Sequence, residues 1–212
     1  MGKIFRLSPR NPEVNAINVA VDVIKNGGII VYPTDTLYGL GVNALNSEAV
    51  LKVFNAKRRP LNKPLPLVVS GIDMASKLAL ITKEARKLMN VFWPGALTII
   101  LKKKLVVPSI VVSGGTSVGL RMPNHPVPLM IIKMCGFPLI ATSANKHGKP
   151  NLLGIQEAIR QIGNQVDLIL DCGKSGGEPS TIIDLTKMTP RIVRKGPVSK
   201  KMLEKEVGDI EY

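Results

Sequence analysis

The residues best suited to chemistry in this sequence follow an apolar run, residues 28–32, which is typical of a buried strand. Residues 34–36, Thr-Asp-Thr, come directly after it and offer two hydroxyl groups and a carboxylate. Gly39 and Gly41 follow, where the backbone can turn tightly or let a ligand approach closely. Polar side chains at the end of a hydrophobic strand are typical of binding sites in α/β proteins. We therefore expect a site at the end of this strand.

Cationic side chains stand at a second break of the chain. Lys57, Arg59 and Lys63 lie on a turn bounded by two prolines. Arginine binds carboxylate or phosphate through two parallel hydrogen bonds, lysine acts as a point charge, and hydroxyls hold phosphate oxygens. The other polar residues at chain breaks are Thr34, Thr36, Ser117, Arg121, Ser143, Asn145, Ser180 and Arg194. Together they predict a pocket for a ligand with several negative groups.

Two phosphate-binding signatures are approached but not matched. The glycine pattern of residues 39–44 resembles the dinucleotide fingerprint, but six residues separate it from the preceding strand, whereas the fingerprint's first glycine ends its strand. Residues 173–175, Gly-Lys-Ser, resemble the end of a P-loop, but the earlier glycine that the motif requires is Leu168. Both interpretations are rejected.

Nucleophilic and metal chemistry are also disfavoured. Ser143 lacks the glycines that flank the serine of an α/β-hydrolase, so pairing it with His147 does not predict a hydrolase. Cys135, Cys172 and His125 have no paired spacing of the kind that metal sites use. We expect no metal ion held by protein side chains.

Composition restricts the partners and the location. The chain has 212 residues, 45% of them hydrophobic, and a formal net charge of +14, which attracts polyanions such as nucleotides or RNA. Aromatic residues make up only 4%, which argues against base recognition by stacking. The two cysteines are expected to be reduced core residues, which indicates a cytoplasmic chain. No apolar run approaches the roughly 20 residues that span a bilayer, so no membrane is expected.

Helical and strand-like segments alternate along the sequence. A first helix is expected to begin at a capping Asn11 and end at Gly27. Further helices are expected at residues 47–56, 82–92, 127–135, 155–162 and 199–207, and strands at 28–32, 65–69, 96–101, 118–121, 139–142, 168–171, 181–185 and 191–194. The late succession of strands predicts an α/β fold with a mixed sheet. We expect one domain over residues 1–212, with a core at about 11–197 and a short charged C-terminal helix at 199–207.

Several segments, taken in order, resemble one known family. They are residues 32–41 (Tyr-Pro-Thr-Asp-Thr-Leu-Tyr-Gly-Leu-Gly), Lys57-x-Arg59 with Lys63-Pro64, Pro94-Gly95-x-x-Thr98, Arg121-x-Pro123, residues 142–145 (Thr-Ser-Ala-Asn) and Ser180-Thr181. This order is similar to that of the YrdC-type threonylcarbamoyl-AMP synthases, over nearly the whole chain. The resemblance implies a twisted mixed β-sheet with flanking helices and a basic concave groove.

The resemblance also implies an activity. Members condense L-threonine, bicarbonate and ATP, with Mg²⁺, into threonylcarbamoyl-AMP and pyrophosphate. A separate threonylcarbamoyl-transferase complex then modifies the adenosine beside the anticodon of certain tRNAs. Because a carbamate oxygen attacks the α-phosphate, fixed cations and Mg²⁺ must stabilise negative charge, and no covalent protein nucleophile is needed.

Roles for single residues follow from the matched motifs. The resemblance places Thr34, Thr36, Arg121, Ala141 and Ser180 around threonine, with Arg121 on its carboxylate. It gives Lys57 and Arg59 the catalytic role of holding bicarbonate and the nascent carbamate. It assigns nucleotide contacts to Arg59, Lys63, Ser117, Ser143, Asn151 and Arg194.

The chain departs from the family pattern in two respects. Many members have a histidine where Val68 stands, which removes one expected contact to threonine. Longer members carry a second C-terminal domain, whereas this chain resembles the short, single-domain form.

Two other functions compete with this interpretation. One is a carbamoyl-adenylate-forming domain of the hydrogenase-maturation type, on the same fold. The other is a non-catalytic RNA-binding module, which the charge of +14 motivates. RNA or tRNA binding is a further expectation for the enzyme as well.

Overall fold

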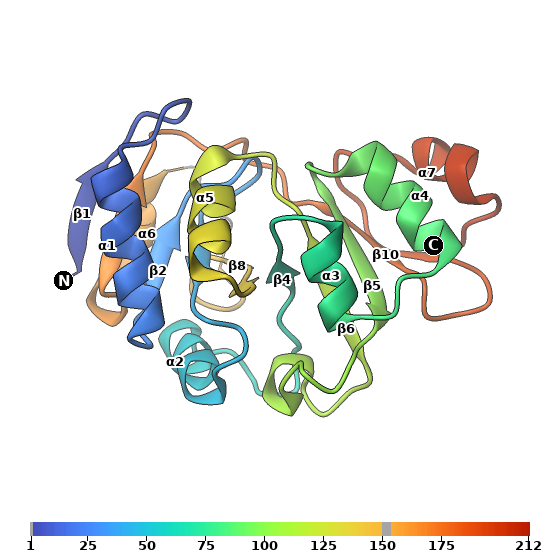
Figure 1. The fold of residues 1–212 in the computed structure, drawn as a ribbon, viewed down its shortest axis with the longest axis horizontal. Coiled ribbons are helices and arrows are strands. Elements are labelled where there is room, and N and C mark those ends of the chain that lie inside the picture. Colours follow the sequence, from blue (N-terminus) through green and yellow to red (C-terminus); the bar gives the residue numbers. More distant parts are fainter. Residues whose placement is uncertain (1, 150–153) are drawn as a thin grey trace.

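The strands form two mixed sheets in the computed structural model, which describes residues 2–149 and 154–212 (Figure 1). The first sheet has the order β1 (Lys3–Arg6), β9 (Leu168–Asp171), β2 (Ile30–Tyr32), β3 (Gly39–Gly41) and β8 (Thr142–Ser143). The second has the order β11 (Arg191–Arg194), β10 (Thr181–Asp184), β5 (Leu97–Lys102), β6 (Ser117–Arg121), β4 (Leu67–Val68) and β7 (Leu139–Ile140). Each sheet contains parallel and antiparallel pairs, which confirms the mixed α/β class.

One short segment joins the sheets. The strand expected at residues 139–142 divides into β7, which pairs with β4 in the second sheet, and β8, which pairs with β3 in the first. Ala141 stands between them, and its N–H donates to the carbonyl of Pro66 at 2.8 Å. At Ala141 the chain therefore passes directly from the second sheet to the first.

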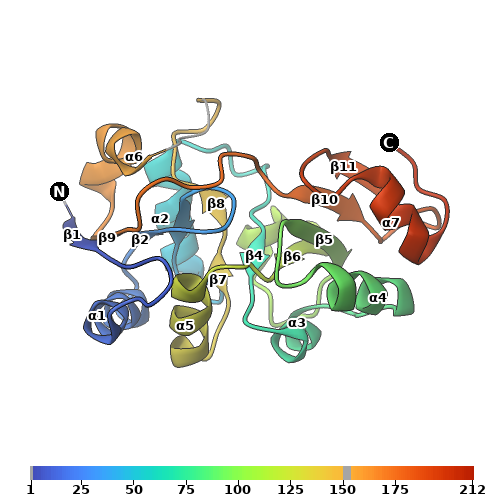
Figure 2. The ribbon, with the colours of Figure 1, turned by 90° about the horizontal axis from the view of Figure 1, so that it is seen from above.

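Strand β2 is apolar throughout because both faces of its sheet are covered. Ile30 and Tyr32 belong to a core with α1 (Val14–Lys25) and α5 (Pro126–Cys135), which lie side by side in Figure 2. Val31 belongs to a second core on the opposite face. The other helices are α2 (Ser47–Lys57), α3 (Ile72–Leu78), α4 (Lys83–Phe92), α6 (Ile155–Ile162) and α7 (Lys200–Val207), with 3₁₀ turns at η1 (Ser109–Val112) and η2 (Gly163–Gln165).

Some local expectations are wrong. Helix α1 begins at Val14 with Glu13 in the capping position, so Asn11 does not cap it. Strand β1 is absent from the predicted strands because two of its four residues are charged and most of them are exposed, at the sheet edge. Helix α3 has seven residues, which is too short for a clear helical period.

Gly39 and Gly41 lie in strand β3 rather than in a turn, which corrects the loop expected there. The ring of Tyr32, on the neighbouring strand, occupies the space that side chains would need. A Cβ at Gly41 would lie 2.7 Å from Cε1 of Tyr32, and one at Gly39 would lie 3.0 Å from its Cζ. The hydroxyl of Tyr32 donates to the carbonyl of Ile140 at 3.1 Å. The two glycines thus seat an aromatic ring against the β7 segment.

Gly41→Ala is expected to lower the free energy of unfolding by about 1–3 kcal/mol, because the added methyl overpacks the Tyr32 ring. Urea titration measures this change. Gly71→Ala is the matched control, since a Cβ there meets nothing within 4 Å, and we expect a change of about 1 kcal/mol or less. Equal stability of the two variants would contradict the packing role of Gly41.

Candidate functional site

A pocket of about 270 Å³ opens where the two sheets meet. Its wall includes eight residues that the sequence predicts for the site: Thr34, Thr36, Arg59, Arg121, Ala141, Ser143, Ser180 and Arg194. They come from β6, the junction of β7 and β8, β8 itself, the end of β11 and the loops after β2, α2 and β9. Residues far apart in sequence are therefore brought to one place, as expected.

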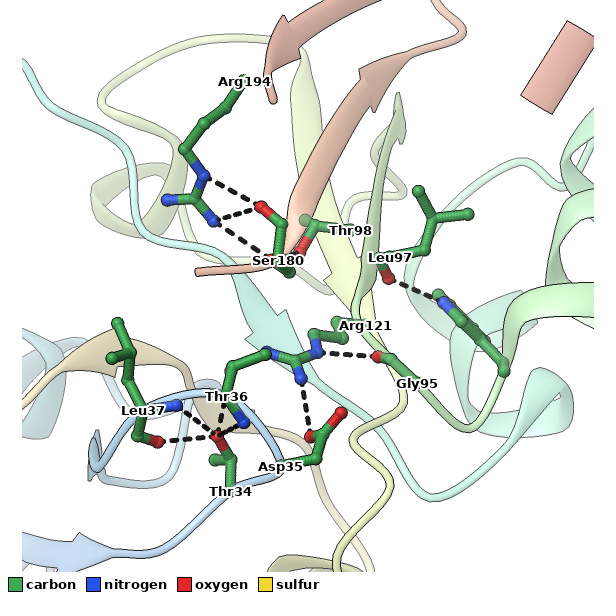
Figure 3. A network of polar contacts seen from close by, with 11 residues as sticks. Thr34, Asp35, Thr36, Leu37, Gly95, Leu97, Thr98, Arg121, Ser180 and Arg194 are labelled. Atoms are coloured by element: carbon green, nitrogen blue, oxygen red, sulfur yellow. Dashed lines mark hydrogen bonds and ion pairs between the residues drawn. The ribbon is translucent and has the colours of Figure 1, made fainter. Parts of the chain in front are cut away.

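Arg121, the last residue of β6, lies at the centre of the site (Figure 3). Its Nε donates to the carbonyl of Gly95 at 2.9 Å, Nη1 donates to Oγ1 of Thr36 at 2.7 Å, and Nη2 pairs with Oδ1 of Asp35 at 2.6 Å. A guanidinium has five N–H groups, so these three contacts leave two available. The side chain is thus fixed in orientation and can still bind an anion.

The loop after β2 is held by its own hydroxyls. Oγ1 of Thr34 accepts the N–H groups of Thr36 and Leu37, both at 3.1 Å, and donates to the carbonyl of Leu37 at 2.6 Å. Such a turn fixes the backbone locally. Thr34 therefore shapes the loop, and Thr36 presents its hydroxyl to Arg121.

A second polar group stands on the opposite side of the pocket. Oγ of Ser180 lies 2.8 Å from Oγ1 of Thr98, and both side chains are buried. Arg194 donates from Nε and Nη2 to the carbonyl of Ser180, at 2.9 and 2.7 Å, and from Nη2 to its Oγ at 3.0 Å. Burial and, secondarily, the positive charge of Arg121 lower the pKa of Arg194. The guanidinium groups of Arg121 and Arg194 therefore both lie in the pocket wall, and their positive charge favours anionic ligands.

Lys57 lies behind the wall rather than on it. The side chain is 1% exposed, and Nζ donates to the carbonyls of Ser143 and Asn145 and to Oδ1 of Asn145, at 2.5, 2.6 and 3.3 Å. An ammonium group has three donors, so all are used within the protein. Burial, with a smaller effect of the charge of Arg59, lowers the pKa of Lys57 to about 7. Lys57 therefore supports the turn that carries Ser143.

Arg59 reaches the pocket from the turn after α2. Its Nε and Nη2 donate to the carbonyls of Lys63 and Pro64, both at 3.0 Å, and Nη1 lies 3.4 Å from Nδ1 of His147. Desolvation and the charges of Arg59, Lys57 and Lys63 lower the pKa of His147. Arg59 therefore brings a guanidinium both to the pocket wall and close to His147.

Three predicted nucleotide contacts are not part of the described pocket wall. The side chain of Lys63 is exposed, although its carbonyl orients Arg59. Ser117 begins β6 and Arg121 ends it, so the two stand about 13 Å apart along the strand. Asn151 lies outside the described residues. Among the residues that the structure describes, no group of three or more His, Cys, Asp and Glu side chains is placed to hold a metal ion.

The sequence analysis assigned no site role to the rest of the wall, although several of its residues stand in the matched motifs. The structure adds Tyr32, Leu37, Tyr38, Gly39, Pro64, Pro66, Val68, Thr98, Thr142, Pro179 and Ile182. A signal existed for Thr98, which is a single hydroxyl in the apolar strand β5. Val68 was placed near the site only by the family histidine that it replaces, because an apolar residue in a short buried strand is ordinary by itself. Its place on the wall makes part of the pocket apolar.

The family is shown by sequence comparison. The family model Sua5_yciO_yrdC, described as "Telomere recombination", matches residues 22–196. The chain therefore belongs to the Sua5_yciO_yrdC family, which confirms the resemblance seen in the sequence.

Individual relatives agree with this membership. The chain is 37% identical over 196 residues to the threonylcarbamoyl-AMP synthase of Pyrococcus abyssi, covering 92% of this chain, and 35% identical over 207 residues to that of Bacillus subtilis, covering 96%. It spans only 58% and 59% of the lengths of those two proteins. The crystal structure of P. abyssi Sua5 complexed with L-threonine superposes with a TM-score of 0.95 at 36% identity, covering 98% of this chain and 62% of that one.

More distant structures share the fold alone. HypF in its phosphate- and nucleotide-bound form has a TM-score of 0.77 at 21% identity, covering 85% of this chain and 29% of that one.

Within residues 2–149 and 154–212, none of the helices has the length and apolar character needed to cross a membrane.

Proposed function

We propose that this chain is an L-threonylcarbamoyladenylate synthase, a nucleotidyltransferase that forms threonylcarbamoyl-AMP and pyrophosphate from L-threonine, bicarbonate and ATP. The observation that carries the proposal is the fixed guanidinium of Arg121, which keeps two N–H groups beside the hydroxyl of Thr36 in a small pocket. That arrangement suits the carboxylate of an amino acid. The synthases to which the chain is similar, one of them solved with L-threonine, support the same substrate.

The pocket divides by chemistry into two parts. Arg121, Thr36 and Ser180 would surround the amino acid, whose carboxylate pairs with Arg121. Arg59, Ser143 and Arg194 would face the nucleotide, because a guanidinium and a hydroxyl suit phosphate oxygens. Lys57 would act through the Ser143 turn, since its three donors are already used.

The reaction then proceeds in two bond-forming steps. The threonine amine attacks the carbon of bicarbonate, water leaves, and a carbamate forms. A carbamate oxygen next attacks the α-phosphate of ATP, and the bond to pyrophosphate breaks. Arg59 and Arg194 would stabilise the negative charge that grows during this displacement.

Magnesium would enter with the nucleotide. Mg²⁺ keeps several waters and binds mainly through phosphate oxygens in many nucleotide sites. Among the described residues the pocket wall includes hydroxyls and cations and no carboxylate, and the nearby carboxylate of Asp35 is paired with Arg121, which fits an ion carried by ATP rather than by the protein. Bound in that way, the ion would neutralise phosphate charge during transfer.

The product of such an enzyme is an intermediate. A threonylcarbamoyl-transferase complex acting on tRNA would consume it, and the +14 charge favours direct contact with RNA as well. A cytoplasmic location would place the enzyme with tRNA and ATP. We also propose that residues 1–212 form a single catalytic domain.

Pyrophosphate release with each substrate omitted in turn tests the activity. We expect release from Mg-ATP to require both L-threonine and bicarbonate. Release that needs neither would refute the proposal. Turnover with carbamoyl phosphate in their place would favour a carbamoyl-adenylate-forming domain, and tight RNA binding without any turnover would favour a non-catalytic RNA-binding module.

A further inference from the structure

A connector, defined here as residues 173–180, passes from β9 of the first sheet to β10 of the second (Figure 2). Its last two residues, Pro179 and Ser180, belong to the pocket wall. Nothing in the proposed chemistry uses the residues before them. Those residues nevertheless contact Asp35 and Thr36, the two loop residues that bind Arg121.

The connector is first anchored at its beginning. The hydroxyl of Tyr38 donates to the carbonyl of Gly173 at 2.7 Å and accepts the N–H of Cys172 at 3.0 Å. Tyr38 is buried, and burial raises its pKa, so the hydroxyl stays neutral and able to donate. The start of the connector is therefore fixed to a residue of the pocket wall.

The second anchor joins the connector to the loop after β2. The N–H of Gly177 donates to the carbonyl of Thr36 at 2.7 Å. At Gly176 the two backbones approach so closely that a Cβ would lie 2.5 Å from the carbonyl oxygen of Asp35. A backbone atom blocks that space, so any side chain at Gly176 must push the connector and the loop apart.

The same two loop residues hold the guanidinium of Arg121. Asp35 pairs with Nη2 and Thr36 accepts from Nη1. A displacement of their backbone would therefore turn the guanidinium. The connector also ends at Ser180, on the other side of the pocket.

We propose that Gly176 is a positioning residue for the amino-acid subsite. By letting the connector lie directly against Asp35 and Thr36, it keeps the two unused N–H groups of Arg121 aimed at the substrate carboxylate. The inference rests on the proposed function, because the ligand is taken to be L-threonine. Of the residues that would face the nucleotide, Arg59 makes no described hydrogen bond to the connector, and Arg194 bonds to it only at its last residue, Ser180, so we expect ATP binding to depend less on Gly176.

Gly176→Ala tests the proposal through the dissociation constants of L-threonine and ATP, each measured by calorimetry. Misplacement of a binding group by about 1 Å has large effects, so we expect threonine to bind about 10-fold more weakly or worse, and ATP to change by less than about 3-fold. Lys174→Ala, an exposed side chain on the same connector, is the control, and its affinities should equal those of the wild type.

A second variant covers the case in which Gly176→Ala does not fold. Tyr38→Phe removes only the hydroxyl that holds Gly173, and we expect several-fold weaker threonine binding with ATP binding retained. Unchanged threonine affinity in the folded variants would overturn the positioning role. A wild-type chain that binds no L-threonine would instead refute the proposed function, so the two failures are distinguishable.

Discussion

Arg121→Ala is expected to raise the KM for L-threonine by about 100-fold or more, because it removes the guanidinium that would pair with the carboxylate of the substrate. The KM for ATP should change far less, since Arg121 lies with Thr36 on the amino-acid side of the pocket. Steady-state kinetics with each substrate varied in turn measures the two KM values.

Two further variants separate charge from geometry. Arg121→Lys keeps the positive charge but loses the planar fork that contacts Gly95, Thr36 and Asp35 together, so an intermediate rise in KM is expected. Arg86→Ala, an exposed arginine on α4, is the control and should leave both constants unchanged. Equal rises in the two KM values of Arg121→Ala would remove Arg121 from the amino-acid subsite.

Lys57→Met is expected to reduce kcat by about 100-fold or more, because the turn that carries Ser143 loses the donors that hold it. It should also lower the free energy of unfolding by several kcal/mol, at about 1–3 kcal/mol for each buried acceptor left unpaired. Turnover and urea titration are measured on the same preparation. Lys52→Met, at an exposed lysine of the same helix, is the control. Near-normal kcat in a folded Lys57→Met variant would contradict this role.

The pH dependence of stability gives an independent test of the buried lysine. Its pKa is about 7 in the folded chain, whereas an unfolded lysine has a pKa of about 10.4. Between these values the unfolded chain binds a proton that the folded chain does not, so this residue makes stability rise with pH from about 7 to about 10. Below about pH 7 both states are charged and the cost of burying the ammonium is fully present.

The stability difference between wild type and Lys57→Met should therefore grow in favour of the wild type across that window, by on the order of 1 kcal/mol per pH unit. Urea titrations at pH 6.5, 8 and 9.5 cover it. A constant difference would mean that the three acceptor oxygens keep Lys57 protonated at all these pH values.

The positions of chain breaks were the most informative part of the sequence. Polar residues at strand ends meet where sheets end, and for that reason the sequence predicts that Thr36, Arg121 and Ser180 lie together, as they do in the pocket wall. The same reasoning could not place Ser117, because a residue type does not tell which end of a strand faces the site. Strand direction depends on pairing between distant segments, which a single sequence does not specify.

The burial of a charged side chain was the main feature that the sequence did not predict. A lysine followed by two arginines is ordinarily a surface residue, yet Lys57 is enclosed because the turn at residues 143–145 offers it three oxygens. The sequence also does not tell whether a glycine forms a turn or makes room for a neighbouring side chain. Gly41 reads as a turn residue, and only the neighbouring strand shows that it makes room for Tyr32.

In the part of the chain that the structure describes, the polypeptide passes between the two sheets three times: after α2, at Ala141, and along residues 173–180. Each passage contributes to the pocket wall, through Arg59, Ala141 and Ser180. New chain ends in any of them would fall within the site. For circular permutation the exposed loop at Leu105 is the better place to cut, because it joins two strands of the same sheet and lies outside the pocket wall.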